Sequence, residues 1–267
     1  MKLKKLLKVI GIFVLLIVLG VSATVLALSS TKAADGILFA AHRGYSGSYP
    51  ENTLPAFEEA VKAGFYAFEC DVQTTKDGKW VVIHNQTIDA MTNGEGNVNS
   101  YTYEELQEFS IDNGNGIENF ENLKIPLLDD VLSVCDTSEI IPIIEVKGGE
   151  IEQLSALYEI IVSHSLQSRC VIISFDFEYL TEMKKFDKDI SCMYIVKDLT
   201  KEAVDMCINN GNIGLDFNCY KNIFNPAIKY AKDNNLELGV WTVDWNFLAN
   251  YFYANKVELV TTNKLIH

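Results

Sequence analysis

From residue 37 onward the chain alternates short apolar runs, rich in β-branched residues, with longer amphipathic stretches. This alternation is typical of repeated strand and helix units around a parallel sheet. Strands are expected at 37–42, 65–71, 140–147, 170–175, 192–197, 213–217, 238–243 and 258–262. Eight parallel strands with intervening helices predict an α/β protein with a closed (β/α)8 TIM barrel.

Amphipathic segments fit between these strands. Helices are expected at 54–63, 151–164, 178–186, 202–209, 226–234 and 246–254. The side chain of Thr53 is expected to cap the first of them, and Gly64 to end it. A further apolar run, 79–84, follows the second strand through a turn at 76–78 that is too short for a parallel crossover. We therefore expect an antiparallel hairpin that brings His84 toward the carboxyl-terminal face of the barrel.

Residues 85–137 do not fit a simple strand and helix unit. They hold a short predicted helix at 103–109, a loop rich in Gly and Asn at 113–119, and a second helix that begins near Leu128. This segment is predicted to be a small insertion after the second barrel strand, placed over the mouth of the barrel.

The amino terminus is a separate region. Residues 1–8 are basic, and residues 9–28 carry no charge; at about 1.5 Å per residue such a helix spans a bilayer core of about 30 Å. We expect 9–28 to be a single-pass transmembrane anchor or uncleaved signal, followed by a linker at 29–36 and one barrel domain at 37–267. The lysines before the apolar run predict that residues 1–8 lie in the cytoplasm and the barrel domain on the extracytoplasmic side of the cell membrane.

Charge narrows the possible partners. The formal net charge is −14, and five of the 22 basic residues precede Ala33 whereas all 36 acidic residues follow it. This balance argues against binding to nucleic acid and against adsorption to an anionic membrane surface. A small anionic substrate remains compatible if a bound cation and nearby basic side chains reverse the local potential. The six cysteines lie mostly in or beside apolar runs, which favours buried thiols over disulfides.

Polar side chains gather at the carboxyl ends of the first three predicted barrel strands. The first strand ends at His42-Arg43, the second carries Glu69 and Asp71, and the third ends at Glu145-Val146-Lys147. Residues two apart in a strand point to the same side, and the carboxyl ends of barrel strands form the usual active-site face. Three carboxylates so close together repel unless a cation lies between them, and an all-oxygen ligand set suits Mg²⁺ or Ca²⁺.

The order of these motifs resembles the glycerophosphodiester phosphodiesterase family. The matching motifs are His42-Arg43-Gly44, Pro50-Glu51-Asn52-Thr53, Glu69-Cys70-Asp71, His84, Glu145-Val146-Lys147 and Val240-Trp241-Thr242-Val243. The resemblance implies metal ligands at Glu69, Asp71 and Glu145. It implies an acid and base pair at His42 and His84, with substrate contacts from Arg43, Lys147 and Trp241. Glu51 and Asn52 are then expected to orient Arg43 or the metal ligands.

Several points of mechanism stay open at this level. We assign His42 as the base and His84 as the acid, although the reverse is also compatible. The nucleophile is either water or a neighbouring hydroxyl of the substrate, which would give a cyclic phosphate. Two positions depart from the family pattern: Asn85 and Asn263 stand where the family usually has Asp.

The resemblance implies hydrolysis of glycerophosphodiesters to sn-glycerol 3-phosphate and an alcohol, with one divalent cation. One alternative is a phospholipase-like phosphodiesterase that acts on lysophospholipids or on polyol-phosphate polymers of the cell envelope. Another is a surface barrel that binds a ligand without catalysis, although every motif residue needed for catalysis is present. The sequence leaves the oligomeric state open.

Overall fold

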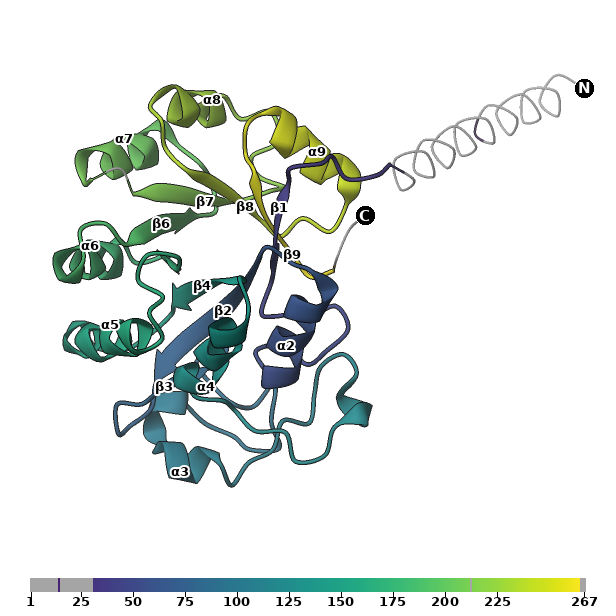
Figure 1. Cartoon of the computed structure of the whole chain (residues 1–267), viewed down its shortest axis with the longest axis vertical. Helices are drawn as coiled ribbons and strands as arrows, with labels where there is room; N and C mark the ends of the chain where they lie inside the picture. Colours follow the sequence, from purple (N-terminus) through teal and green to yellow (C-terminus); the bar gives the residue numbers. More distant parts are fainter. Residues whose placement is uncertain (1–13, 15–30, 212, 265–267) are drawn as a thin grey trace, which may run out of the picture.

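The structure, a computed structural model, describes Val14 and residues 31–211 and 213–264. Its centre is a closed parallel barrel, which confirms the predicted (β/α)8 fold (Figure 1). Neighbouring strands follow the order β1, β9, β8, β7, β6, β5, β4, β2, and pairing of β1 with β2 closes the ring. The barrel strands are β1 (Leu38–Ala41), β2 (Ala67–Thr74), β4 (Ile141–Val146), β5 (Val171–Ser174), β6 (Ser191–Val196), β7 (Gly214–Asn218), β8 (Leu238–Trp241) and β9 (Leu259–Thr262).

Helices form an outer layer around this barrel (Figure 1). They are α2 (Leu54–Ala63), α4 (Leu128–Leu132), α5 (Leu154–Ser163), α6 (Phe177–Phe186), α7 (Lys201–Asn209), α8 (Pro226–Asp233) and α9 (Asn246–Ala254). The helices expected between strands are confirmed to within a residue or two, except that the stretch 151–153 before α5 is a separate 3₁₀ turn.

Local signals explain some of the helix ends, but one predicted cap is wrong. Gly64 ends α2 in a left-handed conformation with φ of 82°, as expected. The Thr53 side chain makes no cap bond to α2 and instead donates from Oγ1 to the carbonyl oxygen of Pro50 at 2.6 Å. Because that carbonyl lies within reach, the hydroxyl stabilises the preceding turn rather than the helix. Side-chain caps are present elsewhere, for example at Asp176 before α6 and Thr200 before α7.

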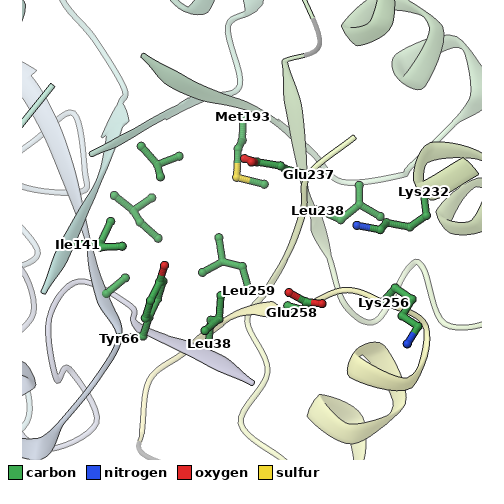
Figure 2. Close-up of a pocket in the computed structure, with 13 residues that line it drawn as sticks. Leu38, Tyr66, Ile141, Met193, Lys232, Glu237, Leu238, Lys256, Glu258 and Leu259 are labelled. Carbon is green, nitrogen blue, oxygen red and sulfur yellow. The ribbon is translucent and has the colours of Figure 1, made fainter. Parts of the chain in front are cut away.

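The interior of the barrel has an apolar layer beneath a charged one. The apolar layer consists of Ala40, Ala67, Ile143, Ile173, Met193 and Ile195. Two residues further along their strands, and therefore on the same inward side, lie Glu69 and Glu145. At the amino-terminal end of the strands, a cavity of about 240 Å³ is lined mainly by apolar side chains, among them Tyr66, Met193 and Leu259 (Figure 2).

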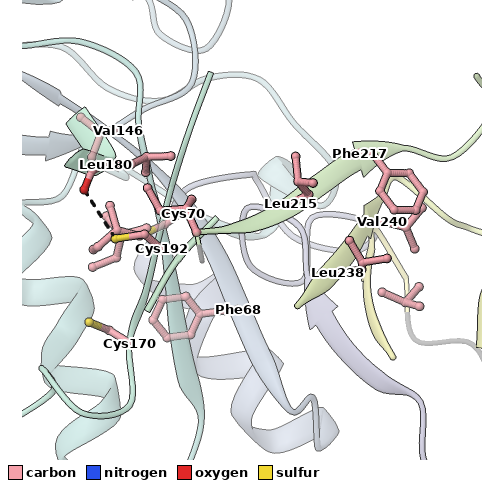
Figure 3. Packing of buried hydrophobic residues seen from close by; sticks show 14 of the residues in the cluster. Phe68, Cys70, Val146, Cys170, Leu180, Cys192, Leu215, Phe217, Leu238 and Val240 are labelled. Atoms are coloured by element: carbon pink, nitrogen blue, oxygen red, sulfur yellow. Dashed lines mark hydrogen bonds between the residues drawn. The ribbon is translucent and has the colours of Figure 1, made fainter. Parts of the chain in front are cut away.

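The main hydrophobic core lies between the strands and the helical layer. Figure 3 shows part of it, where Phe68 and Cys70 of β2 lie near Cys170 and Cys192, and where Phe217 lies beside Val240. The six cysteines, all within the described residues, are buried and unpaired, which confirms the prediction of buried thiols. Outward-facing β2 residues pack in this core, so the alternate positions of the same strand are left to face the barrel interior.

The hairpin and the insertion follow the second barrel strand as predicted. Strand β3 (Trp80–Val82) pairs antiparallel with β2. Residues 85–137 include α3 (Tyr103–Leu106) and pack around a small core of their own: Val81, Ile83, Ile88, Val98, Leu106, Ile111 and Ile125. The insertion contacts the segment after β1, where Asn115 Nδ2 donates to the Ser46 carbonyl oxygen at 2.8 Å. It thus lies beside the carboxyl-terminal end of the first two strands.

The predicted basic segment 1–8 and, apart from Val14, the predicted membrane segment 9–28 lie outside the described residues. Among the residues that are described, none belongs to a helix with the length and apolar character needed to cross a bilayer. The described part of the linker, from Thr31, leads past α9 into β1 (Figure 1).

Candidate active site

A cavity of about 190 Å³ opens at the carboxyl-terminal end of the barrel. Its lining contains seven of the residues selected from the sequence: His42, Arg43, Glu69, His84, Glu145, Lys147 and Trp241. The remaining lining residues are Ile173, Phe175, Ile195, Asp216 and Thr261. None of these belongs to the insertion at 85–137, a segment that the structure describes in full, so the insertion borders the cavity without lining it.

Three carboxylates form one acidic cluster in this region. Glu69, Asp71 and Glu145 each offer an oxygen atom, and these atoms lie within 4.8 Å of one another. The register explains the proximity, because Asp71 of β2 is paired with Glu145 of β4. Among the described residues, Glu69 Oε1 and Asp71 Oδ1 are buried without a hydrogen-bond partner. Buried carboxylate oxygens that lack a donor fit a hard divalent cation.

Burial and neighbouring charges shift the pKa values of the three carboxylates. Burial, followed by the nearby charges of Asp71 and Glu145, raises the pKa of Glu69 well above its ordinary value. Burial and the charge of Asp71 likewise raise the pKa of Glu145 to about 7. For Asp71 itself, burial acts to raise the pKa, but Arg43 and other nearby cations outweigh it and lower the pKa. The three side chains need a cation between them to be ionised together.

Two basic side chains border the cluster. Arg43 donates from Nη1 to both carboxylate oxygens of Glu51, at 2.8 and 2.9 Å, and its Nε lies 3.4 Å from Asp71 Oδ2. Lys147 Nζ donates to Glu145 Oε1 at 3.0 Å and lies 3.5 Å from Asp71 Oδ1. Both cations therefore point toward the carboxylates and toward the cavity, where an anionic substrate would meet them.

The turn after β1 is held in an unusual backbone conformation. Arg43 and Asn52 both have left-handed backbones, with φ of 58° and 56°, which is uncommon for residues other than glycine. Hydrogen bonds stabilise this turn: the Asn52 backbone N–H donates to the Arg43 carbonyl oxygen at 2.9 Å, and the Arg43 N–H donates to Glu69 Oε2 at 2.8 Å. Asn52 also donates from Nδ2 to Asp71 Oδ2 at 2.8 Å. Glu51 and Asn52 thus contact the residues that they were expected to orient.

His42 is fixed by a chain of hydrogen bonds that reaches the last strand. Its Nδ1 lies 2.7 Å from Asn263 Oδ1, and Asn263 donates from Nδ2 to Asp244 Oδ2 at 2.9 Å. Because the amide nitrogen of Asn263 donates to Asp244, its amide oxygen faces the imidazole and can only accept. The proton therefore lies on Nδ1, and Nε2 of the neutral ring carries a lone pair. Burial, followed by the charge of Arg43, lowers the pKa of His42.

His84 has a similar arrangement on the hairpin side. Its Nδ1 lies 2.8 Å from Asn85 Oδ1. The Gln73 amide fixes the backbone beneath it by donating to the carbonyl oxygens of Ile83, His84 and Asn85, at 2.8, 3.2 and 2.7 Å. Burial lowers the pKa of His84, with Asp71 acting in the opposite direction and Arg43 in the same one. The two positions that depart from the family pattern are thus the two partners of the imidazole rings.

One wall of the cavity is apolar. Phe175 follows β5 and meets the Trp241 ring edge to face, with centroids 5.9 Å apart and planes at 84°. Trp241 donates from Nε1 to the Asp216 carbonyl oxygen at 3.4 Å, and its ring lines the cavity. A substrate held by the charged side would therefore place an apolar portion against these rings.

Asp216, which was not predicted from the sequence, also lines the cavity. This side chain is 4% exposed, and its Oδ1 is buried without a hydrogen-bond partner among the described residues. Burial, followed by the charge of Glu145, raises its pKa to about 8. A signal was present in the sequence, because a lone carboxylate between Leu215 and Phe217 in an apolar strand must occupy an inward position when its neighbours face the core. Asp244 was also missed, since its contact with Asn263 joins two different strand ends.

Comparisons with known proteins agree with this geometry. A family model described as the glycerophosphoryl diester phosphodiesterase family matches residues 42–266. A glycerophosphodiester phosphodiesterase from Caldanaerobacter subterraneus subsp. tengcongensis is 34% identical over 212 residues, which cover 78% of this chain and 86% of the relative. A glycerophosphodiester phosphodiesterase structure from Parabacteroides distasonis has a TM-score of 0.72 at 26% identity and covers 87% of this chain and 94% of its own. A phosphodiesterase from Oleispira antarctica, solved in complex with the product sn-glycerol 3-phosphate, has a TM-score of 0.77 at 23% identity, with coverage of 84% and 92%.

Proposed function

The chain belongs to the glycerophosphoryl diester phosphodiesterase family, and on that premise we propose that it hydrolyses glycerophosphodiesters to sn-glycerol 3-phosphate and an alcohol. The observation that carries the proposal is the placement of two imidazoles, an acidic cluster and two cationic side chains on one cavity. The product bound to the Oleispira antarctica phosphodiesterase supports the same substrate class.

The acidic cluster is the proposed cation site. Glu69, Asp71 and Glu145 would hold one divalent cation, Mg²⁺ or Ca²⁺, and the oxygen-only donor set supports either. When bound, the cation supplies positive charge to the non-bridging phosphate oxygens. Arg43 and Lys147 add hydrogen-bond donors on the same side and orient the phosphate by charge.

The two imidazoles divide the proton transfers. His42, with its proton held on Nδ1 by Asn263, offers Nε2 as the base that deprotonates the nucleophile. His84 then protonates the leaving alcohol. In the reverse assignment, His84 is the base and a protonated His42 is the acid. The nucleophile is water in direct hydrolysis. If it is a neighbouring hydroxyl of the substrate, a cyclic phosphate is released first.

We also propose that the enzyme is held at the outer face of the cell membrane by residues 9–28. The uncharged run and the lysines before it support this placement. A membrane-bound substrate such as a lysophospholipid is then a second candidate, and the apolar wall formed by Phe175 and Trp241 favours it. A lysophospholipid is also a glycerophosphodiester, so the chemistry is unchanged.

The test is release of glycerol 3-phosphate from glycerophosphocholine by the full chain in detergent, with Mg²⁺ or Ca²⁺ and after EDTA treatment. We expect cation-dependent turnover that is lost in His42→Ala. His164→Ala is the matched control, because His164 contacts Asp129 and Asp136 away from the cavity and should retain turnover. Turnover that survives both EDTA and His42→Ala would contradict the proposal.

A further inference from the structure

The linker that precedes β1 is attached along α9 (Figure 1). Asn246 donates from Nδ2 to the Thr31 carbonyl oxygen at 2.6 Å. Asn250 donates to the Lys32 carbonyl oxygen and accepts from the Ala34 N–H, both at 2.7 Å. Thr31 thus lies near the first turn of α9, and the linker then follows the helix toward its end before it becomes β1.

This path places the start of the linker at the same end of the barrel as the cavity. Helix α9 follows β8, so its first residue, Asn246, lies at the carboxyl-terminal end of the strands. Leu28 ends the proposed membrane segment and is three residues before Thr31. An extended chain covers at most about 3.6 Å per residue, so the proposed membrane segment ends within about 11 Å of this point.

Aromatic side chains are exposed around the same end. They are Phe175 after β5, Tyr220 and Phe224 after β7, and Trp245 before α9, with exposed fractions of 43%, 61%, 83% and 43%; we refer to them as the aromatic rim. Phe224 packs against Tyr251 of α9, with ring centroids 5.4 Å apart, and Lys264 Nζ lies 5.3 Å from the Trp245 ring. The rim is therefore continuous with the helix that carries the linker.

Exposed large apolar side chains at the opposite end are fewer. Apart from Val14, the described ones are Tyr66 before β2, Val162 near the end of α5 and Phe186 at the end of α6. Each precedes a strand of the barrel or ends a helix that leads into one, so each lies toward the amino-terminal end. Four of the six large exposed aromatics among the described residues thus lie at the end of the barrel where the linker begins.

We propose that the aromatic rim docks on the lipid bilayer that holds residues 9–28, so that the mouth of the active site faces the lipid. The inference rests on the proposed membrane anchor and deepens the proposed function.

Tyr and Trp are favoured at the boundary between lipid and water because they combine an apolar ring with a polar group. A tether this short keeps the rim at the membrane. Phe175 belongs both to the rim and to the apolar wall of the cavity, so the rim reaches the mouth of the active site. Docking would therefore present that mouth to a lipid substrate such as the lysophospholipid proposed above.

The orientation can be measured with a label on the full chain in phosphatidylcholine vesicles. All six native thiols are buried, so a cysteine introduced at the surface reacts selectively. Phe224→Cys at the rim and Phe186→Cys at the opposite end, each carrying an environment-sensitive fluorophore, form a matched pair. We expect lipids with a shallow nitroxide to quench the label at 224 several-fold more than the label at 186. Equal quenching, or stronger quenching at 186, would overturn the proposal.

The membrane anchor and the catalytic proposal are tested by separate measurements. Failure of the chain to float with vesicles would remove the anchor and overturn the docking with it. Turnover of glycerophosphocholine in detergent tests the catalytic proposal and is independent of the quenching result.

A second comparison uses activity. The double variant Tyr220→Ser/Phe224→Ser should lose several-fold activity on vesicle-embedded lysophosphatidylcholine and keep its activity on soluble glycerophosphocholine. The control Tyr66→Ser/Phe186→Ser should keep both activities. Equal effects of the two double variants on the embedded substrate would contradict docking through the rim.

Discussion

The amide that orients His42 provides a test of the proposed proton transfers. His42 Nδ1 donates to Asn263 Oδ1, and Asn263 in turn donates to Asp244. Asn263→Asp alone would place two carboxylates at a 2.9 Å contact. The exchange Asn263→Asp/Asp244→Asn avoids this repulsion, because an amide at 244 can donate to the new carboxylate. Its own oxygen can still accept the bonds that Asp244 Oδ1 receives from the Thr262 hydroxyl and the 263 backbone N–H.

The size of the effect follows from moving one negative charge next to the imidazole. The exchange keeps the net charge of the chain but replaces a neutral acceptor at 2.7 Å from Nδ1 with a carboxylate. An opposite charge at this range raises the pKa of an imidazole by about 1 to 3 units. Each unit corresponds to about 1.4 kcal/mol in favour of the protonated ring. The base form of His42 is then depleted at neutral pH.

The assay is the pH dependence of kcat/KM for glycerophosphocholine. If His42 is the base, the acidic limb of the pH profile moves to higher pH by the same amount, about 1 to 3 pH units. If His42 is the acid, the alkaline limb moves instead, which would reverse our assignment of the two histidines. Asn85→Asp should raise the pKa of His84 in the same way. This variant serves as the comparison, because the other limb of the pH profile should move. If the exchange variant folds and neither limb of its pH profile moves, the role given to the contact between His42 and Asn263 is refuted.

Three further results are expected. Glu69→Gln should lose binding of the divalent cation, seen by isothermal titration calorimetry, because it removes one charge from the acidic cluster; binding equal to that of the wild type would contradict the proposed cation site. Arg43→Lys should lower kcat by about 100-fold, since a lysine cannot contact Glu51 and Asp71 together and the phosphate contact is misplaced; a change confined to KM would contradict this positioning role. Asp216 has a folded pKa of about 8, well above its unfolded value, so the folded state binds more protons and its stabilising effect is lost as the pH rises toward 8. The melting temperature of Asp216→Asn in EDTA should therefore exceed that of the wild type by more at pH 8 than at pH 5, and a constant difference would contradict the assigned pKa.

The sequence predicted the barrel strands well because each is a short apolar run bounded by polar residues. Their inward and outward alternation also placed Glu69 and Glu145 on the correct side. The Thr53 cap failed because the choice between the helix N–H groups and the Pro50 carbonyl depends on the turn geometry, which the residue types do not determine.

The contacts of the two asparagines could not be predicted from sequence spacing. Asn85 is adjacent to His84, but Asn263 lies 221 residues from His42, and only the pairing of β1 with β9 brings them together. Asp216 was missed for a different reason, since a single carboxylate in an apolar strand has no sequence neighbour with which it forms a motif. Its position in an apolar strand indicated an inward side chain, but only the closed barrel shows that this side chain lines the cavity with an unpaired oxygen.

The pairing of β1 with β9 has a consequence for synthesis of the protein. His42 is made early, yet its backbone N–H donates to the Thr262 carbonyl oxygen at 2.9 Å and its side chain contacts Asn263. A nascent chain still on the ribosome therefore lacks a correctly oriented His42 until β9 has emerged and joined the barrel. A partly made chain would therefore have no phosphodiesterase activity, and the onset of turnover in a translation reaction would report the moment at which the ring of strands closes.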